Sequence, residues 1–272
     1  MLEIENLKDK ALWVRKETLK IHKIAPETRL ASSLSLVEIL VALYYGRILR
    51  FDPMNPLWEK RDRLVISKGH GSISLYPILA DLGFFGTEEL GRVCMKGGLL
   101  GGMPDPSIPG YETINGSLGH GLGVACGISK ALTLKSKSEK VFVLHGDGEL
   151  YEGAVWEAVM FAGAHKLSNL ILIIDNNKVS MLDYCKNIIN LEPIGDKFKA
   201  FNWEVKEVDG HDMGQLIDGI KELKESGVNN PKLLLANTIK GKGVASLETD
   251  SLSHIKILSK IEADNAIAGL SR

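Results

Sequence analysis

Apolar residues recur along the first part of the chain at the spacing of helices. Within residues 3–24 they fall close to a 3.6-residue period, at Leu7, Ala11, Leu12, Val14, Leu19 and Ile21, which predicts an amphipathic helix ended by Pro26. A second helix is predicted over residues 35–45, with Ser35 as its cap and Glu38 at the capping-box position. The polar stretch FDPMNPLWEKRDR that follows predicts a loop.

Glycine is dense between residues 64 and 123, in the segments LVISKGHGS, KGGLLGGMPDPSIPG and NGSLGHGLG. A helical pattern, ISLYPILADLG, separates the first two of these segments. Glycine allows backbone to approach a ligand closely, although loops alone also use it. We therefore expect part of this region to surround a ligand.

The second half alternates between strand and helix patterns. Short aliphatic runs at residues 141–144 and 170–174 enclose a helical pattern at residues 151–166, which predicts a βαβ unit. A strand at 203–208, a helix at 212–225 and a strand at 232–238 continue the alternation. The predicted fold is α/β, a parallel sheet flanked by helices on both faces, in one domain spanning residues 1–272. The weakly periodic tail after Lys242 is interpreted as a partner-docking arm.

Composition narrows the class of protein. With 272 residues, 44% of them hydrophobic, the chain can bury a full core. Its 33 basic and 34 acidic residues are interspersed, so we expect neither a nucleic acid nor a membrane as partner. The charged start MLEIENLKDK is unlike a signal peptide. Cys94, Cys126 and Cys185 lack disulfide or metal spacing, which favours reduced, buried thiols in a cytoplasmic protein.

Two strand ends carry polar residues suited to a metal ion. Gly146-Asp147-Gly148 follows the first run of the βαβ unit, and Asn177 follows the second. If the two strands are neighbours, Asp147 and Asn177 reach the same edge of the sheet, where parallel sheets bind ligands. Mg²⁺ is commonly held by one or two protein oxygens together with phosphates and water. The pair therefore predicts a Mg²⁺-diphosphate site.

Other interpretations of Asp147 and its flanking glycines fit the sequence less well. Asp-Gly alone commonly marks a turn, but a second polar strand end thirty positions later is not explained by a turn. The segment GDGELYEG lacks the third glycine of a dinucleotide-binding loop, and the sequence contains no P-loop lysine motif.

Several segments together resemble the amino-terminal section of transketolase. They are RDRLVISKGHGS, GYETINGSLGHGLGVACG, GDGELYEGAVWEA, DNNKVSMLD and DGHD, and the resemblance runs from about Ser32 to about His254. It implies thiamine diphosphate and Mg²⁺ as cofactors. The implied metal ligands are Asp147, Asn177 and the carbonyl of Val179, and the implied catalytic residues are His70 and His254. The implied cofactor contacts are Gly116, Leu118, Gly146, Gly148, Glu149, Glu152, Glu157 and Met181, of which Glu152 and Glu157 also serve communication between subunits.

The resemblance also implies a partner. Thiamine diphosphate stabilises a carbanion, and in the family a glutamate on a separate pyrimidine-binding domain activates it. This chain is similar to the first subunit of a split enzyme, so the pyrimidine-binding and carboxyl-terminal domains are expected on a transketolase C-terminal subunit, in an α₂β₂ assembly. The implied activity is that of a transferase that moves a two-carbon ketol or acyl unit from a ketose phosphate or 2-oxo acid to an aldehyde.

Two positions depart from the family pattern. Arg29 and Met103 stand where the family has histidines that contact the donor substrate. Arginine binds carboxylate or phosphate, and methionine cannot donate a hydrogen bond. The hypothesis is that the donor lacks a terminal hydroxyl, as pyruvate or another 2-oxo acid does, or that the acceptor is an unusual anionic sugar; neutral drift in an ordinary transketolase is the alternative. The competing functions are those of the α subunit of a 2-oxo acid dehydrogenase and of a catalytically silent binding subunit.

Overall fold

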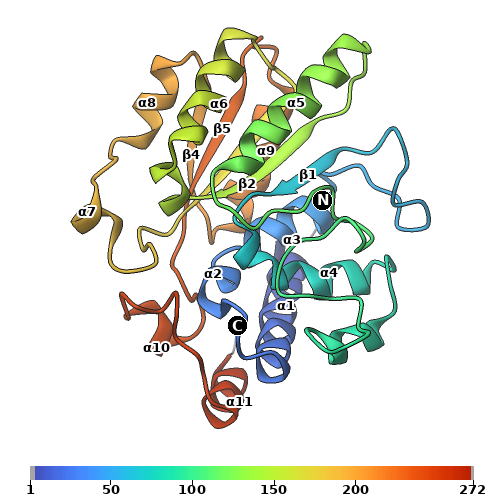
Figure 1. The fold of residues 1–272 in the computed structure, drawn as a ribbon, viewed down its shortest axis with the longest axis vertical. Helices are drawn as coiled ribbons and strands as arrows, with labels where there is room; N and C mark the ends of the chain where they lie inside the picture. The colour runs from blue at the N-terminus through green and yellow to red at the C-terminus, as the bar shows by residue number, and fades with distance from the viewer. Residues whose placement is uncertain (1–3, 271–272) are drawn as a thin grey trace.

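A parallel five-stranded sheet forms the centre of the molecule, in the order β1-β2-β3-β5-β4 (Figure 1). The computed structural model describes residues 4–270. The strands are β1 Arg63–Ile66, β2 Val141–Gly146, β3 Leu170–Asn176, β4 Glu204–Asp209 and β5 Lys232–Asn237. The βαβ prediction is confirmed, because β2 and β3 are adjacent and parallel with α6, Gly153–Ala164, between them in sequence.

Helices surround this sheet. Besides α6, the helices are α1 Ile4–Ile24, α2 Leu30–Leu34, α3 Val37–Tyr45, α4 Leu75–Asp81, α5 His120–Leu134, α7 Cys185–Ile188, α8 Ile194–Ala200, α9 Met213–Glu225, α10 Ala245–Glu248 and α11 Lys260–Gly269. Three 3₁₀ helices join them: η1 Gly69–Ser74, η2 Thr87–Arg92 and η3 Gly148–Tyr151.

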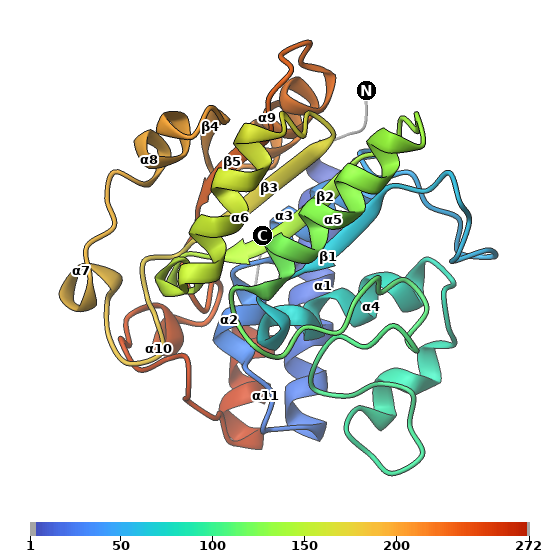
Figure 2. The same ribbon diagram turned by 45° about the horizontal axis from the view of Figure 1, so that its top comes forward.

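Both faces of the sheet are covered, as predicted (Figure 2). Alternate residues of a strand point to opposite faces. On β2, Phe142 and Leu144 pack in a layer with α1, α3, α4 and α9, whereas Val141 and Val143 pack in a second layer with α5, α6 and α8. Because every residue of β2 and β3 is buried, their aliphatic runs have no polar alternation.

The first predicted helix is confirmed as α1, although Glu3 lies outside the described residues. The capping box at Ser35 and Glu38 is wrong. Helix α3 begins at Val37 and has no side-chain cap, because the Ser35 hydroxyl donates to the Asp175 carboxylate at 2.7 Å. The Ser35 hydroxyl thus binds the buried Asp175 carboxylate of the sheet instead of capping the helix.

Two elements were missed in the glycine-rich region. Strand β1 has only four residues, and it pairs with β2 at the edge of the sheet. Helix α5 contains Gly121, Gly123 and Gly127, which interrupt the helical repeat of its apolar residues. Of these, Gly121 packs against Ser67, where a Cβ would lie 2.8 Å from the Ser67 Cα. A close approach between helix and strand therefore explains that glycine.

The tail after Lys242 packs on its own chain. Val244, Leu247, Leu258 and Ala263 form a buried cluster with Leu19, Leu30, Ala31 and Leu34 of α1 and α2. Helix α11 lies beside α1 (Figure 1). The buried side of the tail thus packs on its own chain, and the interpretation of the tail as a partner-docking arm stays a prediction for its exposed side.

All three cysteines are free thiols, as expected, but their burial differs. Cys126 is buried and Cys185 is half-buried, whereas Cys94, which has a φ of 59°, is exposed. The expectation of burial is therefore wrong for Cys94. Within residues 4–270, no helix has both the length and the apolar character needed to cross a membrane.

Candidate active site

A cavity of about 290 Å³ lies at the carboxyl ends of the strands. Four strands place a side chain there shortly after they end: Lys68 follows β1, Asp147 follows β2, Asn177 follows β3 and Lys240 follows β5. The prediction that the ends of β2 and β3 meet is confirmed, since the Asp147 amide donates to the Asp175 carbonyl at 3.3 Å. Sheet topology alone brings these distant residues together.

Asp147 is a buried carboxylate, and within residues 4–270 no cationic side chain forms an ion pair with it. It accepts hydrogen bonds from the backbone amides of Gly148, at 2.7 Å, and of Lys178. Burial, and then the nearby Asp175 carboxylate, raise its pKa to about 6. A carboxylate in such surroundings gains most from a neighbouring cation, which would return its pKa to the normal range.

Two further residues that line the same cavity, Asn177 and Val179, offer oxygen atoms. The Asn177 amide group is oriented by two contacts, because its Nδ2 donates to Asp175 at 3.0 Å and its Oδ1 accepts from the Val179 amide at 3.1 Å. The Val179 carbonyl accepts from the Lys240 ammonium at 2.7 Å. Carboxylate, amide and carbonyl oxygens are the hard ligands that Mg²⁺ prefers.

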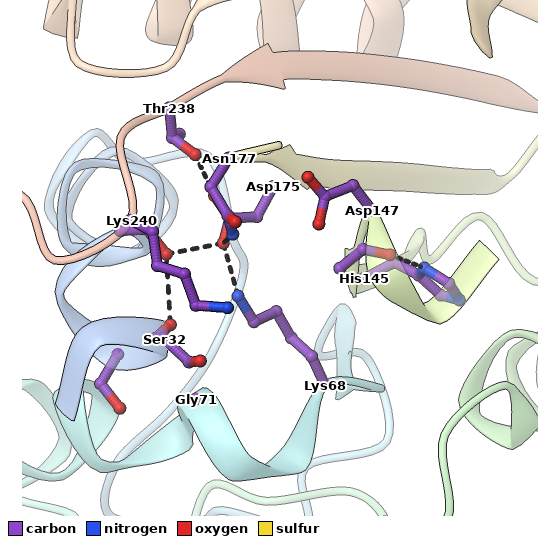
Figure 3. Close-up of polar contacts among 12 residues, drawn as sticks. Ser32, Lys68, Gly71, His145, Asp147, Asp175, Asn177, Thr238 and Lys240 are labelled. Atoms are coloured by element: carbon purple, nitrogen blue, oxygen red, sulfur yellow. Dashed lines mark hydrogen bonds and ion pairs between the residues drawn. The ribbon is translucent and has the colours of Figure 1, made fainter. Parts of the chain in front are cut away.

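Asp175 and Lys68 form a buried ion pair beneath these oxygens (Figure 3). Burial alone would raise the pKa of Asp175. Lys68 and the hydroxyls of Thr238 and Ser35 instead lower it below its usual value, so the group is an anion at neutral pH. The pair fixes the Lys68 ammonium at the floor of the cavity.

Lys240 adds a second buried cation. Its ammonium donates to the carbonyls of Val179 and Ser180 and lies 3.2 Å from Nδ1 of His254. Burial, and then the charge of Lys68, lower its pKa to about 8. Sequence reasoning missed both lysines. Each lysine follows the end of a strand, β1 or β5, by two or three residues, and that position was the available signal for a site residue. Strand β1, however, was not predicted.

His70 and His254 are brought together across the cavity, with ring centroids 4.9 Å apart. Burial lowers the pKa of both rings, and the charges of Lys68, Lys240 and Arg29 lower it further. The pKa of His254 falls to about 3 and that of His70 lies well below its usual value. Both imidazoles are therefore neutral at pH 7 and can donate and accept hydrogen bonds.

The remaining predicted residues divide into two groups. Leu118, Gly146, Gly148, Glu149 and Met181 line the cavity. The Glu149 carboxylate is buried and accepts from Ser67 and from the amides of Gly119, at 2.8 Å, and Gly146, at 3.2 Å. Its side chain thus joins the loop before α5 to the end of β2.

Five predicted residues do not line the cavity. Gly116, Glu152, Glu157 and Met103 are exposed, and Arg29 is half-buried. Arg29 is nevertheless near the site, because its charge acts on both histidines. Ser32, which no prediction included, lines the cavity and contacts Nδ1 of His254 at 3.3 Å.

The donor set fits Mg²⁺ only together with a ligand that brings its own oxygens. Among residues 4–270, no three His, Cys, Asp or Glu side chains are grouped so that they could hold a metal ion. One carboxylate, one amide and one carbonyl leave about half of an octahedral shell to phosphate oxygens and water. Lys68 and Lys240 would neutralise a diphosphate at the same place.

Comparison with known proteins shows which family and which relatives the chain is similar to. Residues 27–268 match the family described as "Transketolase, thiamine diphosphate binding domain". The chain is 37% identical to the 6-deoxy-6-sulfo-D-fructose transketolase subunit SqwG of Clostridium sp. (strain MSTE9), covering 98% of this chain and 97% of SqwG. It is 35% identical to an apulose-4-phosphate transketolase subunit of Actinobacillus succinogenes, covering 99% of this chain and 97% of that protein.

Longer enzymes match over part of their length. Human transketolase is 33% identical over 97% of this chain, which spans 42% of the human protein. The crystal structure of Campylobacter jejuni transketolase superimposes with a TM-score of 0.89 at 32% identity, covering 98% of this chain and 43% of that one.

Proposed function

Because the chain belongs to the transketolase thiamine diphosphate-binding domain family, we propose that it is the N-terminal subunit of a split transketolase-like transferase. The reaction would transfer a two-carbon ketol unit from an anionic ketose to an aldehyde. The observation that carries the proposal is the meeting of Asp147, Asn177 and the Val179 carbonyl with Lys68 and Lys240 at one cavity.

In this proposal the cavity holds the diphosphate end of the cofactor. Asp147, Asn177 and the Val179 carbonyl bind Mg²⁺, while Lys68 and Lys240 balance the diphosphate charge. The amides of Gly148 and Glu149 donate to the same group. Gly116 and Leu118 contact the aminopyrimidine ring, and Met181 packs beside the thiazolium. When bound, thiamine diphosphate supplies the carbanion-stabilising chemistry.

His70 and His254 act on the substrate in this scheme. Both are neutral at pH 7, so each can form a hydrogen bond with a hydroxyl or carbonyl oxygen of the substrate. Because the Lys240 ammonium can only donate, Nδ1 of His254 accepts from it, and Nε2 carries the proton that the ring can donate to the substrate. These two histidines are the proposed proton carriers at the reacting end of the donor.

A second subunit would complete the site. SqwG and the apulose-4-phosphate transketolase protein, each matched along 97% of its length, are named as subunits, whereas human transketolase is matched along only 42% of its length. The proposed partner supplies the pyrimidine-binding and C-terminal domains in an α₂β₂ assembly. Glu152 is exposed at the start of α6, and Glu157 is exposed on the surface of the same helix. Both are proposed to contact the cofactor and the neighbouring subunit.

The donor substrate is proposed from Arg29 and from the names of the relatives. The sulfonated and phosphorylated sugars named for two of them are anionic ketoses, and Arg29, the cation that the diphosphate does not use in this proposal, favours an anionic donor. A second candidate is a 2-oxo acid, favoured by Arg29 and by Met103, which cannot bind a terminal hydroxyl as histidine does.

Steady-state rates with the partner subunit decide between these donors. Faster turnover of a ketose phosphate, such as xylulose 5-phosphate, than of pyruvate would refute the 2-oxo acid. Acyl transfer to a lipoyl acceptor would instead identify the α subunit of a 2-oxo acid dehydrogenase. Absence of turnover with every donor would identify a catalytically silent subunit.

The cofactor assignment is tested by replacing the proposed metal ligand. Asp147→Asn in the assembled enzyme should lower kcat/KM by at least about 100-fold and weaken Mg²⁺-dependent binding of thiamine diphosphate, since the neutral amide cannot offset the charge of the ion. Asp196→Asn, on the exposed surface of α8, is the matched control and should behave as wild type. Equal cofactor affinity in both variants would refute the assignment.

A further inference from the structure

The segment that carries Lys240 has no regular structure of its own. Residues 239–243 lie between the end of β5 and the start of α10, and both Gly241 and Gly243 have positive φ, at 77° and 90°. Such a loop gains no rigidity from a helix or sheet ladder. The position of the Lys240 ammonium in the cavity therefore depends on its own hydrogen bonds to Val179 and Ser180 and on the contacts that hold the backbone on either side of it.

His211 fixes one side of this loop. Its Nε2 accepts a hydrogen bond from the Ile239 amide at 2.8 Å, and its Nδ1 contacts the Glu38 carboxylate at 2.9 Å. Because a backbone amide can only donate, Nε2 carries no proton, so the proton is on Nδ1 and is donated to Glu38. The ring thus bridges two partners in a single tautomer.

Arg15 fixes the other side. Its buried guanidinium donates from Nη1 to the Lys242 carbonyl at 3.0 Å and to the Leu34 carbonyl at 2.8 Å. Its Nη2 forms an ion pair with Glu38, the same carboxylate that orients His211. Anchors therefore stand at residues 239 and 242, on both sides of Lys240.

We propose that Arg15, Glu38 and His211 form a positioning network that holds the Lys240 ammonium at the cavity. Three separate elements contribute: Arg15 comes from α1, Glu38 from α3, and His211 from the DGHD segment that follows β4. Charged and buried hydrogen bonds of this kind are stronger and more directional than exposed ones. None of the three side chains lines the cavity, so they act through the loop. Their relevance to catalysis rests on the proposed function, in which Lys240 binds the diphosphate.

The anchoring is tested on the intact 272-residue chain without cofactor. His211→Phe keeps a ring but removes both hydrogen bonds. It should raise amide hydrogen exchange in residues 239–243, and acetylation of Lys240 by an amine-reactive ester, by about tenfold. His211→Gln, whose carbonyl oxygen can accept from the Ile239 amide, should recover part of the protection. Should His211→Phe fail to fold, Arg15→Lys, which keeps a charge opposite Glu38, tests the second anchor by the same two measurements.

Ser129→Ala is the matched control, because it removes a buried hydrogen bond to Asn169 in the opposite layer. It should lower the thermal midpoint without changing exchange or acetylation at the loop. Loop protection equal to wild type in His211→Phe, or an equal loss in Ser129→Ala, would overturn the proposal.

Calorimetry on the chain assembled with its partner, titrated with Mg²⁺ and thiamine diphosphate, tests the positioning network and the proposed function separately. His211→Phe should weaken cofactor binding by about tenfold while Ser129→Ala leaves it unchanged. If wild type shows no cofactor binding yet the loop loosens in His211→Phe, the network stands and the proposed function fails. If wild type binds the cofactor and His211→Phe binds it equally well, the positioning role fails.

Discussion

At the scale of single residues, buried neutral histidines recur in this protein. His22 is fully buried, its Nδ1 contacts the Thr28 hydroxyl at 3.2 Å, and its Nε2 accepts from the Leu258 amide at 3.2 Å. Burial lowers its pKa below the ordinary value. The ring therefore joins the end of α1 to the tail only in its neutral form.

This arrangement predicts a loss of stability in acid. The pKa of His22 is lower in the folded state than in the unfolded state, so as pH falls below about 6.5 the unfolded state takes up the proton first. The contribution of His22 is complete above that pH and decreases below it, by at most about 1.4 kcal/mol per pH unit. His70 and His254, whose pKa values are also lowered, add to the same trend.

Urea unfolding of wild type and His22→Gln at pH 7.5 and pH 5.5 measures the effect. The variant should be less stable at pH 7.5, because glutamine cannot reproduce both contacts. It should also lose less stability than wild type between the two pH values, since one titrating group is gone. An equal loss in both proteins would contradict the assignment of the acid sensitivity to His22.

At the scale of elements, the packing of α5 against the end of β1 depends on one glycine. A Cβ at Gly121 would lie 2.6 Å from the Ser67 Cβ and 2.8 Å from its Cα, which no side-chain rotation relieves. We predict that Gly121→Ala destabilises the chain by about 1–3 kcal/mol, the usual cost of overpacking. The free energy of unfolding in urea checks this prediction.

Gly127, on the same helix, is the control. A Cβ there would meet no atom within 4 Å, and Gly127 has helical backbone. Gly127→Ala should therefore stabilise the chain by about 0.5–1 kcal/mol through helix propensity. Stabilisation in both variants would show that propensity, rather than contact with Ser67, controls this helix.

At the scale of the whole molecule, the surface around the proposed interface residue Glu157 carries exposed apolar side chains. Helices α5 and α6 leave Val124, Met160 and Phe161 exposed beside Glu157, and exposed apolar groups of this kind favour association. We predict that the isolated chain binds Mg²⁺-thiamine diphosphate at least about tenfold more weakly than the two-chain assembly, because the contacts that the proposed partner makes to the cofactor are absent. Calorimetry with and without the partner measures the difference, and tight binding by this chain alone would contradict it.

The aliphatic runs of β2 and β3 were sufficient to predict two buried parallel strands, and their polar ends predicted Asp147 and Asn177 at one sheet edge. The predicted strands were nonetheless two residues too short. Backbone pairing continues through Gly146 and Asn176, which a hydrophobic pattern does not include. Local pattern thus identified the elements, and strand pairing decided where they end.

The sequence by itself determined the α/β alternation, the family, and the polar residues at the ends of β2 and β3, because these features depend on periodicity and short motifs that are read locally. Only the tertiary structure decided that Lys68 and Lys240 share the cavity with them, that Ser35 serves Asp175 instead of capping a helix, and that His211 and Arg15 hold the loop of Lys240. Those contacts join residues more than a hundred positions apart in most cases. Their partners are selected by burial and sheet order, which no local pattern contains.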